Sequence, residues 1–145
     1  MAENVEKNTP QVGIVLVTHG NFGATLLEAA EMVMGTQENC VAIGVDVTRD
    51  VDETMELIRS SIQKVEQGRG VVTLTDLFGG SPTTMSLSLM KSENLEVITG
   101  VNLPMLVATL QSRSMKLHEL AEKVADAGRQ GIKVAGAMLR KKAKK

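Results

Sequence analysis

The sequence contains no tryptophan, no tyrosine and only two phenylalanines among its 145 residues. Proteins that bind single-stranded nucleic acid stack the bases on aromatic side chains, and nucleic-acid binders in general present a basic surface. This chain has few aromatic residues and a formal net charge of -1, so it lacks both features. We therefore expect no nucleic-acid partner.

Cysteine and histidine are equally scarce. The single cysteine, Cys40, has no partner for an intramolecular disulfide, and the two histidines, His19 and His118, are too few for a zinc site of the usual Cys/His kind. We expect no metal and no cofactor. The polar first eleven residues do not resemble a signal peptide, and no apolar run is long enough to span a bilayer. The sequence thus predicts a cytoplasmic protein without direct membrane insertion.

The composition is that of an ordinary globular protein, with 43% apolar and 23% charged residues. A chain of this length forms one domain and can bury about 68–70% of the surface that it exposes when unfolded. We expect a flexible N-terminal segment over residues 1–11 and a single domain over residues 12–139. The last residues, 140–145, read RKKAKK and are expected to form a basic, disordered tail.

Four short runs rich in Val, Ile and Leu lack polar alternation, as is typical of strands covered on both faces: residues 12–17, 41–45, 71–75 and 95–99. Helical patterns separate and follow them, over residues 24–34, 51–68, 82–90, 103–111 and 117–127. This alternation predicts an α/β fold with a mainly parallel, doubly wound sheet of four strands and helices on both faces. Beyond Gly131, Ile132 and Val134 alternate with Lys133, which predicts a C-terminal edge strand.

A histidine and an aspartate follow two of the predicted strands. His19 ends the run VGIVLVTH, and Asp76 comes directly after the third strand. Ligand sites in parallel sheets lie at the carboxyl ends of strands, so we expect these two side chains to meet. A carboxylate that accepts a hydrogen bond from one ring nitrogen fixes the tautomer and leaves the other nitrogen free as a nucleophile. The alternative for Asp76 is a turn cap.

The residues after Asp76 predict an anion site at the start of a helix. In the segment Gly79, Gly80, Ser81 and Pro82, the glycines let the backbone approach a ligand, Ser81 suits the N-cap and Pro82 the first helical position. Free amides at a helix N-terminus bind anions such as phosphate. The alternative is a simple turn that leads into a helix.

Four motifs together resemble those of the enzyme IIA domain of the mannose-type bacterial phosphotransferase system. They read GIVLVTHGNFG, AEMVMGTQEN, TDLFGGSPTT and VITGVNLPML, and they occur in the order and spacing of that family over residues 12–135. The family often has tryptophan where Phe78 stands here. The resemblance implies a homodimer in which the last strand crosses to the partner's sheet in the antiparallel sense.

The same resemblance implies the roles of the site residues. His19 would receive a phosphoryl group from the phosphocarrier protein HPr and pass it to a IIB component, here a separate chain, for sugar uptake. Asp76 would orient the imidazole, and Thr18, Gly80 and Ser81 would bind the phosphoryl group. The alternative within the same fold is a regulatory sensor of phosphorylation state without a complete sugar permease.

Two further alternatives follow from the residues. A small hydrolase could use Ser81 with His19 and Asp76, although GGSP differs from the usual nucleophile motif and Pro82 removes an amide that commonly completes an oxyanion hole. The two aromatic residues, Phe22 and Phe78, flank the site motifs, so they either form a docking rim for partners or pack beneath the loops. Arg49, Cys40 and His118 are interpreted as a solvated loop residue, a packing residue and a surface residue.

Overall fold

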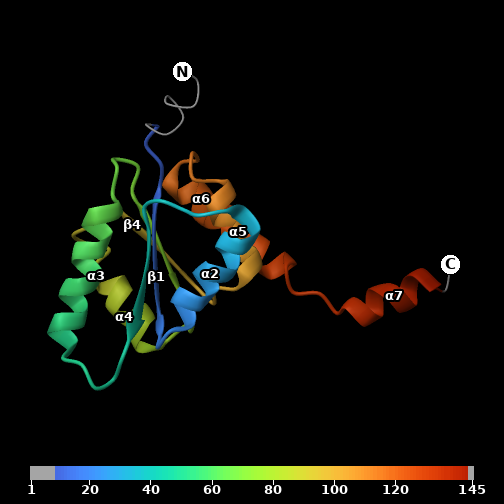
Figure 1. Cartoon of the computed structure of the whole chain (residues 1–145), viewed down its shortest axis with the longest axis horizontal. Helices are drawn as coiled ribbons and strands as arrows, with labels where there is room; N and C mark the ends of the chain where they lie inside the picture. Colours follow the sequence, from blue (N-terminus) through green and yellow to red (C-terminus); the bar gives the residue numbers. More distant parts are fainter. Residues whose placement is uncertain (1–8, 144–145) are drawn as a thin grey trace.

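The computed structural model describes residues 9–143 and contains a parallel four-stranded sheet between two layers of helices (Figure 1). The strands are β1 (Gly13–His19), β2 (Cys40–Val45), β3 (Val71–Thr75) and β4 (Leu95–Thr99), in the spatial order β2-β1-β3-β4. Each neighbouring pair is parallel. The prediction of an α/β fold with a parallel sheet of four strands and helices on both faces is therefore confirmed.

Each face of the sheet is covered by its own set of helices. On one face lie α2 (Phe22–Met34), α5 (Leu103–Gln111) and α6 (Leu117–Gln130). On the other lie α3 (Val51–Val65) and α4 (Ser81–Ser88). The helix starting at residue 135, α7 (Ala135–Ala143), belongs to neither layer and extends away from the body (Figure 1).

The central strand β1 explains why two separate cores form. Successive side chains of a strand point to opposite faces, so Ile14 and Leu16 join the core beneath α2, α5 and α6. Val15 and Val17 join the core beneath α3 and α4. All four side chains are fully buried. Both faces of β1 must therefore be apolar, as the unbroken apolar run in the sequence requires.

The amino ends of the strands are held together by a buried arginine that the sequence pattern did not single out. The Arg113 guanidinium donates from Nε to the carbonyl oxygen of Val12 at 2.9 Å, and from its two terminal nitrogens to the carbonyl oxygens of Glu38 and Asn39 at 2.7 and 2.9 Å. Its charge is thus satisfied by three carbonyl dipoles. This contact lies at the opposite end of the sheet from His19.

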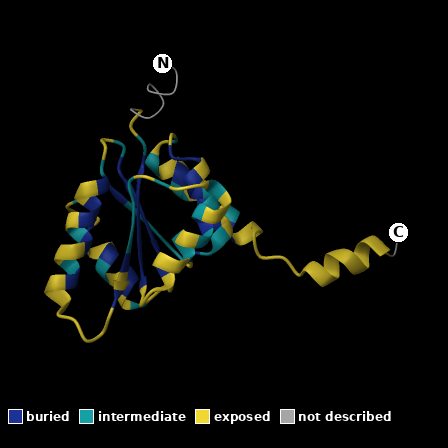
Figure 2. Cartoon of the chain, viewed as in Figure 1, coloured by how far each residue is buried: buried dark blue, intermediate teal, exposed yellow. Residues whose placement is uncertain are grey.

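The predicted C-terminal edge strand does not form within the chain. Residues 132–134 belong to no helix or strand, and α7 follows with no buried residue (Figure 2). The reason is local: Ala, Met, Leu, Arg and Lys are strong helix formers, and a strand of a few residues has no stability without a neighbour to bond.

The two predicted terminal segments lie partly outside the described residues. Residues 1–8 of the N-terminal segment and residues 144–145 of the basic tail are not described. Arg140 to Ala143 lie in α7, so this part of the predicted tail is helical. No helix within residues 9–143 has both the length and the apolar character needed to cross a membrane.

Candidate functional site

His19 is the last residue of β1 and lies where the backbone leaves the sheet. Gly20 turns the chain with a φ of +50°, a conformation that glycine adopts without strain. The paired strand β3 ends at Thr75, which lies beside Val17, so Asp76 emerges next to His19. The register of two parallel strands therefore brings the histidine and the aspartate together, as the sequence predicted.

A pair of hydrogen bonds joins the two residues. Oδ2 of Asp76 accepts from the backbone N–H of His19 at 3.0 Å and lies 2.8 Å from Nδ1 of the imidazole. Because the acceptor is a carboxylate, Nδ1 carries the hydrogen, and the lone pair of the neutral ring lies on Nε2. The side chain of His19 is 47% exposed and that of Asp76 only 15%. The imidazole is thus oriented from the protein side and open on the solvent side.

Asp76 is held in its charged form. Burial raises the pKa of its carboxyl group, but the hydrogen bonds from the His19 backbone and ring outweigh this effect, and the pKa lies below its ordinary value. Oδ1, the second carboxylate oxygen, is buried and has no hydrogen-bond partner among the described residues. The carboxylate therefore binds His19 through one oxygen, Oδ2.

Gly80 lies directly against the imidazole. A Cβ atom at this position would come within 2.9 Å of Cε1 and 3.4 Å of Nε2 of His19. The ring and the backbone of the loop can approach this closely only because residue 80 has no side chain. The Gly80 amide donates to the carbonyl oxygen of Leu77 at 3.2 Å, so this amide is already engaged within the loop.

The helix predicted after the two glycines, α4, begins one residue earlier than the sequence indicated. Gly80 is the N-cap, and its carbonyl accepts from the amide of Thr84 at 3.0 Å. Ser81 is the first helical residue, rather than the predicted N-cap, and Pro82 the second. Ser81 is exposed, and its side chain makes no hydrogen bond within the described part of the chain. The Ser81 to His19 hydrogen bond that a hydrolase would need is therefore missing.

The Thr18 side chain is not part of this cluster. It is fully buried, and its Oγ1 accepts from the amide of Gly23 at 2.7 Å. Neighbouring residues of a strand point to opposite faces, so the hydroxyl that precedes His19 supports the start of α2 and does not reach the imidazole. The family resemblance implied that Thr18 binds the phosphoryl group, but the position of Thr18 next to His19 in the chain does not reveal which face its side chain takes.

The two phenylalanines follow His19 and Asp76 closely in the chain, and both are exposed. Phe78, in the loop after Asp76, is 78% exposed, and Phe22, the first residue of α2, is 44% exposed. This exposure of Phe78 argues against packing in a crevice beneath its loop. The docking interpretation of the two phenylalanines is the one that the geometry favours.

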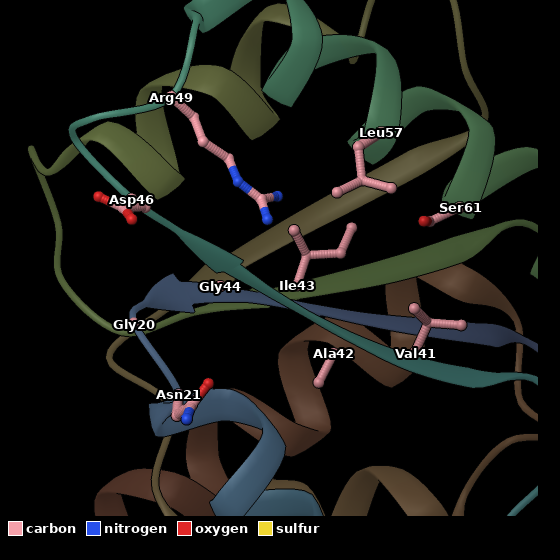
Figure 3. Close-up of a pocket in the computed structure, with 10 residues that line it drawn as sticks. All are labelled: Gly20, Asn21, Val41, Ala42, Ile43, Gly44, Asp46, Arg49, Leu57 and Ser61. Atoms are coloured by element: carbon pink, nitrogen blue, oxygen red, sulfur yellow. The ribbon is translucent and has the colours of Figure 1, made fainter.

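A pocket of about 410 Å³ lies along the free edge of β2, next to the turn that follows His19. Its lining includes Gly20, Asn21 and Arg49. Figure 3 shows the Arg49 side chain extending from the loop after β2 toward Ile43, with Asn21 on the other side of the strand. His19 itself does not line this pocket, so the pocket is a neighbour of the site and not its centre.

In the described part of the chain, neither Cys40 nor His118 joins a second reactive group. Burial raises the pKa of the Cys40 thiol to about 11, which keeps the thiol protonated and unreactive at neutral pH. Within residues 9–143, no group of three or more His, Cys, Asp or Glu side chains lies close enough together to hold a metal ion. His118 lies in the first turn of α6, separate from the His19 cluster.

A family model described as "PTS system fructose IIA component" matches residues 13–127 of the chain. The chain belongs to this family. The match confirms the resemblance to mannose-type IIA domains, and it includes the strands and loops that carry His19, Asp76 and Gly80. The description of the family names its members as IIA components of a phosphotransferase system (PTS).

Curated IIA relatives align over most of the chain. The "PTS system mannose-specific EIIAB component" of Escherichia coli K12 is 37% identical over 125 residues, which are 84% of this chain and 39% of that protein. The chain therefore spans about two fifths of that relative. The "PTS system fructose-specific EIIA component" of Bacillus subtilis is 24% identical over 132 residues and 90% of each chain.

Solved structures agree with this assignment. The phosphotransferase system component EIIA from Streptococcus agalactiae superposes with a TM-score of 0.79 and 27% identity, covering 87% of this chain and 98% of that one. The mannose/sorbose-specific IIA subunit from Enterococcus faecalis, at 21% identity and a TM-score of 0.78, shares the fold.

Proposed function

We propose that this IIA protein carries a phosphoryl group on His19, accepting it from HPr and passing it to a IIB component on a separate chain for sugar uptake. One observation carries the proposal. Asp76 binds Nδ1 of the imidazole at 2.8 Å, so the nucleophilic nitrogen is Nε2, on a ring that is nearly half exposed. A carrier needs a nitrogen of this kind, oriented from behind and accessible to two partners in turn.

The transfer replaces one phosphorus–nitrogen bond with another. The lone pair on Nε2 of His19 attacks phosphorus while the bond from phosphorus to the histidine nitrogen of HPr breaks, and that bond's electron pair returns to the HPr ring. The Nδ1 hydrogen remains between His19 and Asp76, so the substituted ring is a cation beside a carboxylate. No metal or cofactor is required, because positioning and nearby hydrogen-bond donors supply the stabilisation.

We assign the binding of the phosphoryl oxygens to the start of α4. Ser81 offers an exposed hydroxyl and a backbone amide in the first turn of the helix, where the helix dipole favours negative charge. Gly80 contributes by leaving room for the group beside Nε2, since its own amide is bound to Leu77. In this proposal Ser81 binds the phosphoryl group and Gly80 provides the space.

We also propose that the protein works in the cytoplasm as a homodimer in which the segment after Gly131 crosses to the partner. A hollow of about 320 Å³ lies beside the edge strand β4, between that strand and α6. Ile132 and Val134 are 75% and 71% exposed in the single chain. An antiparallel strand from a second copy, laid along β4, would cover the open edge and bury these side chains.

The first test is direct phosphorylation. Incubation with phosphoenolpyruvate, enzyme I and HPr is expected to give a single acid-labile, alkali-stable phosphoryl adduct on the protein. His19→Ala is expected to abolish the adduct, whereas the matched variant His118→Ala is expected to retain it. Labelling that persists in His19→Ala would overturn the assignment of the carrier residue.

A further inference from the structure

We propose that Thr83 is a positioning residue for phosphoryl transfer: its hydroxyl ties the loop of residues 76–80 to α4 and so holds Asp76 and Gly80 against the imidazole of His19. This inference rests on the proposed function of His19. Thr83 itself touches neither the imidazole nor the transferred group in the proposal, so it acts through the loop.

The tether is a buried hydrogen bond. The hydroxyl of Thr83, the third residue of α4, donates to the carbonyl oxygen of Leu77 at 2.7 Å. The Thr83 side chain is 2% exposed, so water does not compete for this bond, and breaking it would leave a buried polar group unpaired. Leu77 follows Asp76 directly, which places the tether one residue from the carboxylate that orients His19.

The hydroxyls of two further threonines lie within reach of the Thr83 hydroxyl. Oγ1 of Thr75 lies 2.6 Å from Oγ1 of Thr83, and Oγ1 of Thr99 lies 3.4 Å from it. A hydroxyl has one hydrogen to donate, and Thr83 uses it on a carbonyl, which can only accept. Thr75 therefore donates to Thr83, and Thr99 approaches the same oxygen at the limit of hydrogen-bond distance. The tether runs from the end of β3 through α4 to the loop.

The loop has little else that packs it in place. Leu77 and Phe78 are both exposed, so neither contributes a buried apolar anchor. Gly79 has a φ of +84°, and the two consecutive glycines add backbone freedom. The Leu77 carbonyl is the point at which the loop closes, since it accepts from both the Gly80 amide and the Thr83 hydroxyl.

Loss of the tether acts on both sides of the imidazole. A shift of Leu77 moves Asp76, whose 2.8 Å bond to Nδ1 keeps the lone pair on Nε2. The same shift moves Gly80, whose backbone lies against Cε1 and Nε2. Misplacement of reacting groups by a fraction of an ångström to an ångström is costly in rate. Thr83 is thereby linked to catalysis without contact with the reacting atoms.

The test compares variants that differ only in the tether. Thr83→Val removes the hydroxyl but leaves the Thr75 hydroxyl without its acceptor, which by itself destabilises the fold. We therefore place the change in a Thr75→Val background, where the Thr75 hydroxyl is absent and the half-buried Thr99 loses only its 3.4 Å contact. The comparison is between Thr75→Val and Thr75→Val/Thr83→Val. Thr83→Ser keeps the hydroxyl and serves as the rescue variant.

Thr109→Val is the matched control away from the site. Thr109 is also fully buried, and its hydroxyl donates to the carbonyl of Met105 at 2.7 Å within α5. Arg113, four residues later, binds the amino end of β1, so Thr109 lies toward the opposite end of the sheet from His19. Its replacement is expected to lower the melting temperature and leave phosphorylation unchanged.

Two measurements decide the matter. Removing the tether is expected to lower the rate of phosphorylation by HPr about tenfold, and Thr83→Ser is expected to restore it. Nitrogen NMR of the imidazole, recorded without any phosphoryl donor, is expected to show that the tautomer protonated on Nδ1 loses population in the double variant. A folded double variant with wild-type rate and tautomer would overturn the proposal, as would a loss of rate that Thr83→Ser does not restore.

The two measurements also separate this inference from the proposed function. If the wild-type protein accepts no phosphoryl group, the carrier function fails. The imidazole tautomer then still reports whether Thr83 positions Asp76 against His19. If the wild type is phosphorylated and Thr83 has no effect on rate or tautomer, only the positioning role fails.

Discussion

At the scale of single residues, the site depends on one carboxylate oxygen. Oδ2 of Asp76 accepts from both the backbone and the ring of His19, so a single residue fixes the position and the tautomer of the imidazole. The sequence offered two roles for Asp76, as an orienting carboxylate or as a turn cap. The contacts with His19, 57 residues away in the chain, favour the first role.

Replacement of Asp76 by asparagine tests this role in the reaction. The amide keeps the shape of the side chain but cannot stabilise the cationic, substituted imidazole as a carboxylate does. We expect Asp76→Asn to fold and to be phosphorylated at least tenfold more slowly, which corresponds to about 1.4 kcal/mol of barrier. A folded variant with the wild-type rate would show that Asp76 serves only the turn.

The lowered pKa of Asp76 predicts a dependence of stability on pH. A carboxyl group with a lower pKa in the folded state binds protons less tightly there than when unfolded. Its stabilisation is complete above the ordinary pKa of 3.8 and is lost as the pH falls through the lower folded value. Urea unfolding of wild type and Asp76→Asn should therefore differ at neutral pH and converge in strong acid. A constant difference across this range would contradict the shift.

At the scale of elements, the loops at the carboxyl ends of the strands supply the site. The turn after β1 presents His19, and the loop between β3 and α4 presents Asp76 and Gly80. The helices support these loops: α4 holds its loop through the Thr83 hydroxyl, and the first turn of α2 donates from the Gly23 amide to the Thr18 hydroxyl of β1. Exposed aromatic residues in these loops are free to meet a partner.

Phe78 tests whether these loops dock partners. Because its side chain is 78% exposed, Phe78→Ala should leave the melting temperature within a few degrees of wild type. A core phenylalanine would instead cost about 3–5 kcal/mol on truncation. The docking role predicts a higher concentration of HPr or IIB for half-maximal transfer.

The control for this experiment is an exposed apolar residue away from the site. Met32 is exposed near the C-terminal end of α2, and Met32→Ala is expected to change neither stability nor the concentration of partner required. A large loss of stability in Phe78→Ala with unchanged partner affinity would contradict docking.

At the scale of the whole molecule, the described part of the single chain leaves an edge strand without a neighbour on its outer side and a C-terminal helix without a buried residue. The edge strand β4 borders a hollow that includes Ile132, while α7 carries exposed Met138 and Leu139 and buries nothing. Apolar surface of this kind is typical of an interface. A second copy of the chain would cover both features at once.

Truncation tests the proposed homodimer. The full-length protein is expected to sediment as a dimer in analytical ultracentrifugation, and a chain that ends at Gly131 is expected to sediment as a monomer. A chain that lacks only residues 140–145 removes the basic end but keeps Ile132 and Val134, so it should remain dimeric. A monomeric full-length protein, or a dimer that survives truncation at Gly131, would contradict the exchange of this segment.

The sequence by itself determined the sheet and the pairing of the two principal site residues. Strands covered on both faces must be apolar on both faces, so four apolar runs predicted four parallel strands, which the structure contains. Parallel strands end at one edge of the sheet. The positions of His19 and Asp76 directly after two such runs therefore predicted their meeting, which the structure shows at 2.8 Å.

Only the tertiary structure decided which groups of the neighbouring residues face the imidazole. Thr18 turns to the opposite face, Gly80 presents its backbone to Nε2, and Thr83 binds the loop from α4. The conformation of the segment after Gly131 could not be predicted either. The alternation over residues 132–134 suits a strand, but in the single chain these residues form no strand, and a helix follows from Ala135. Local sequence sets backbone preference and the face pattern of an element. Contacts between distant segments depend on register and on the presence of a neighbour, which no single stretch of sequence encodes.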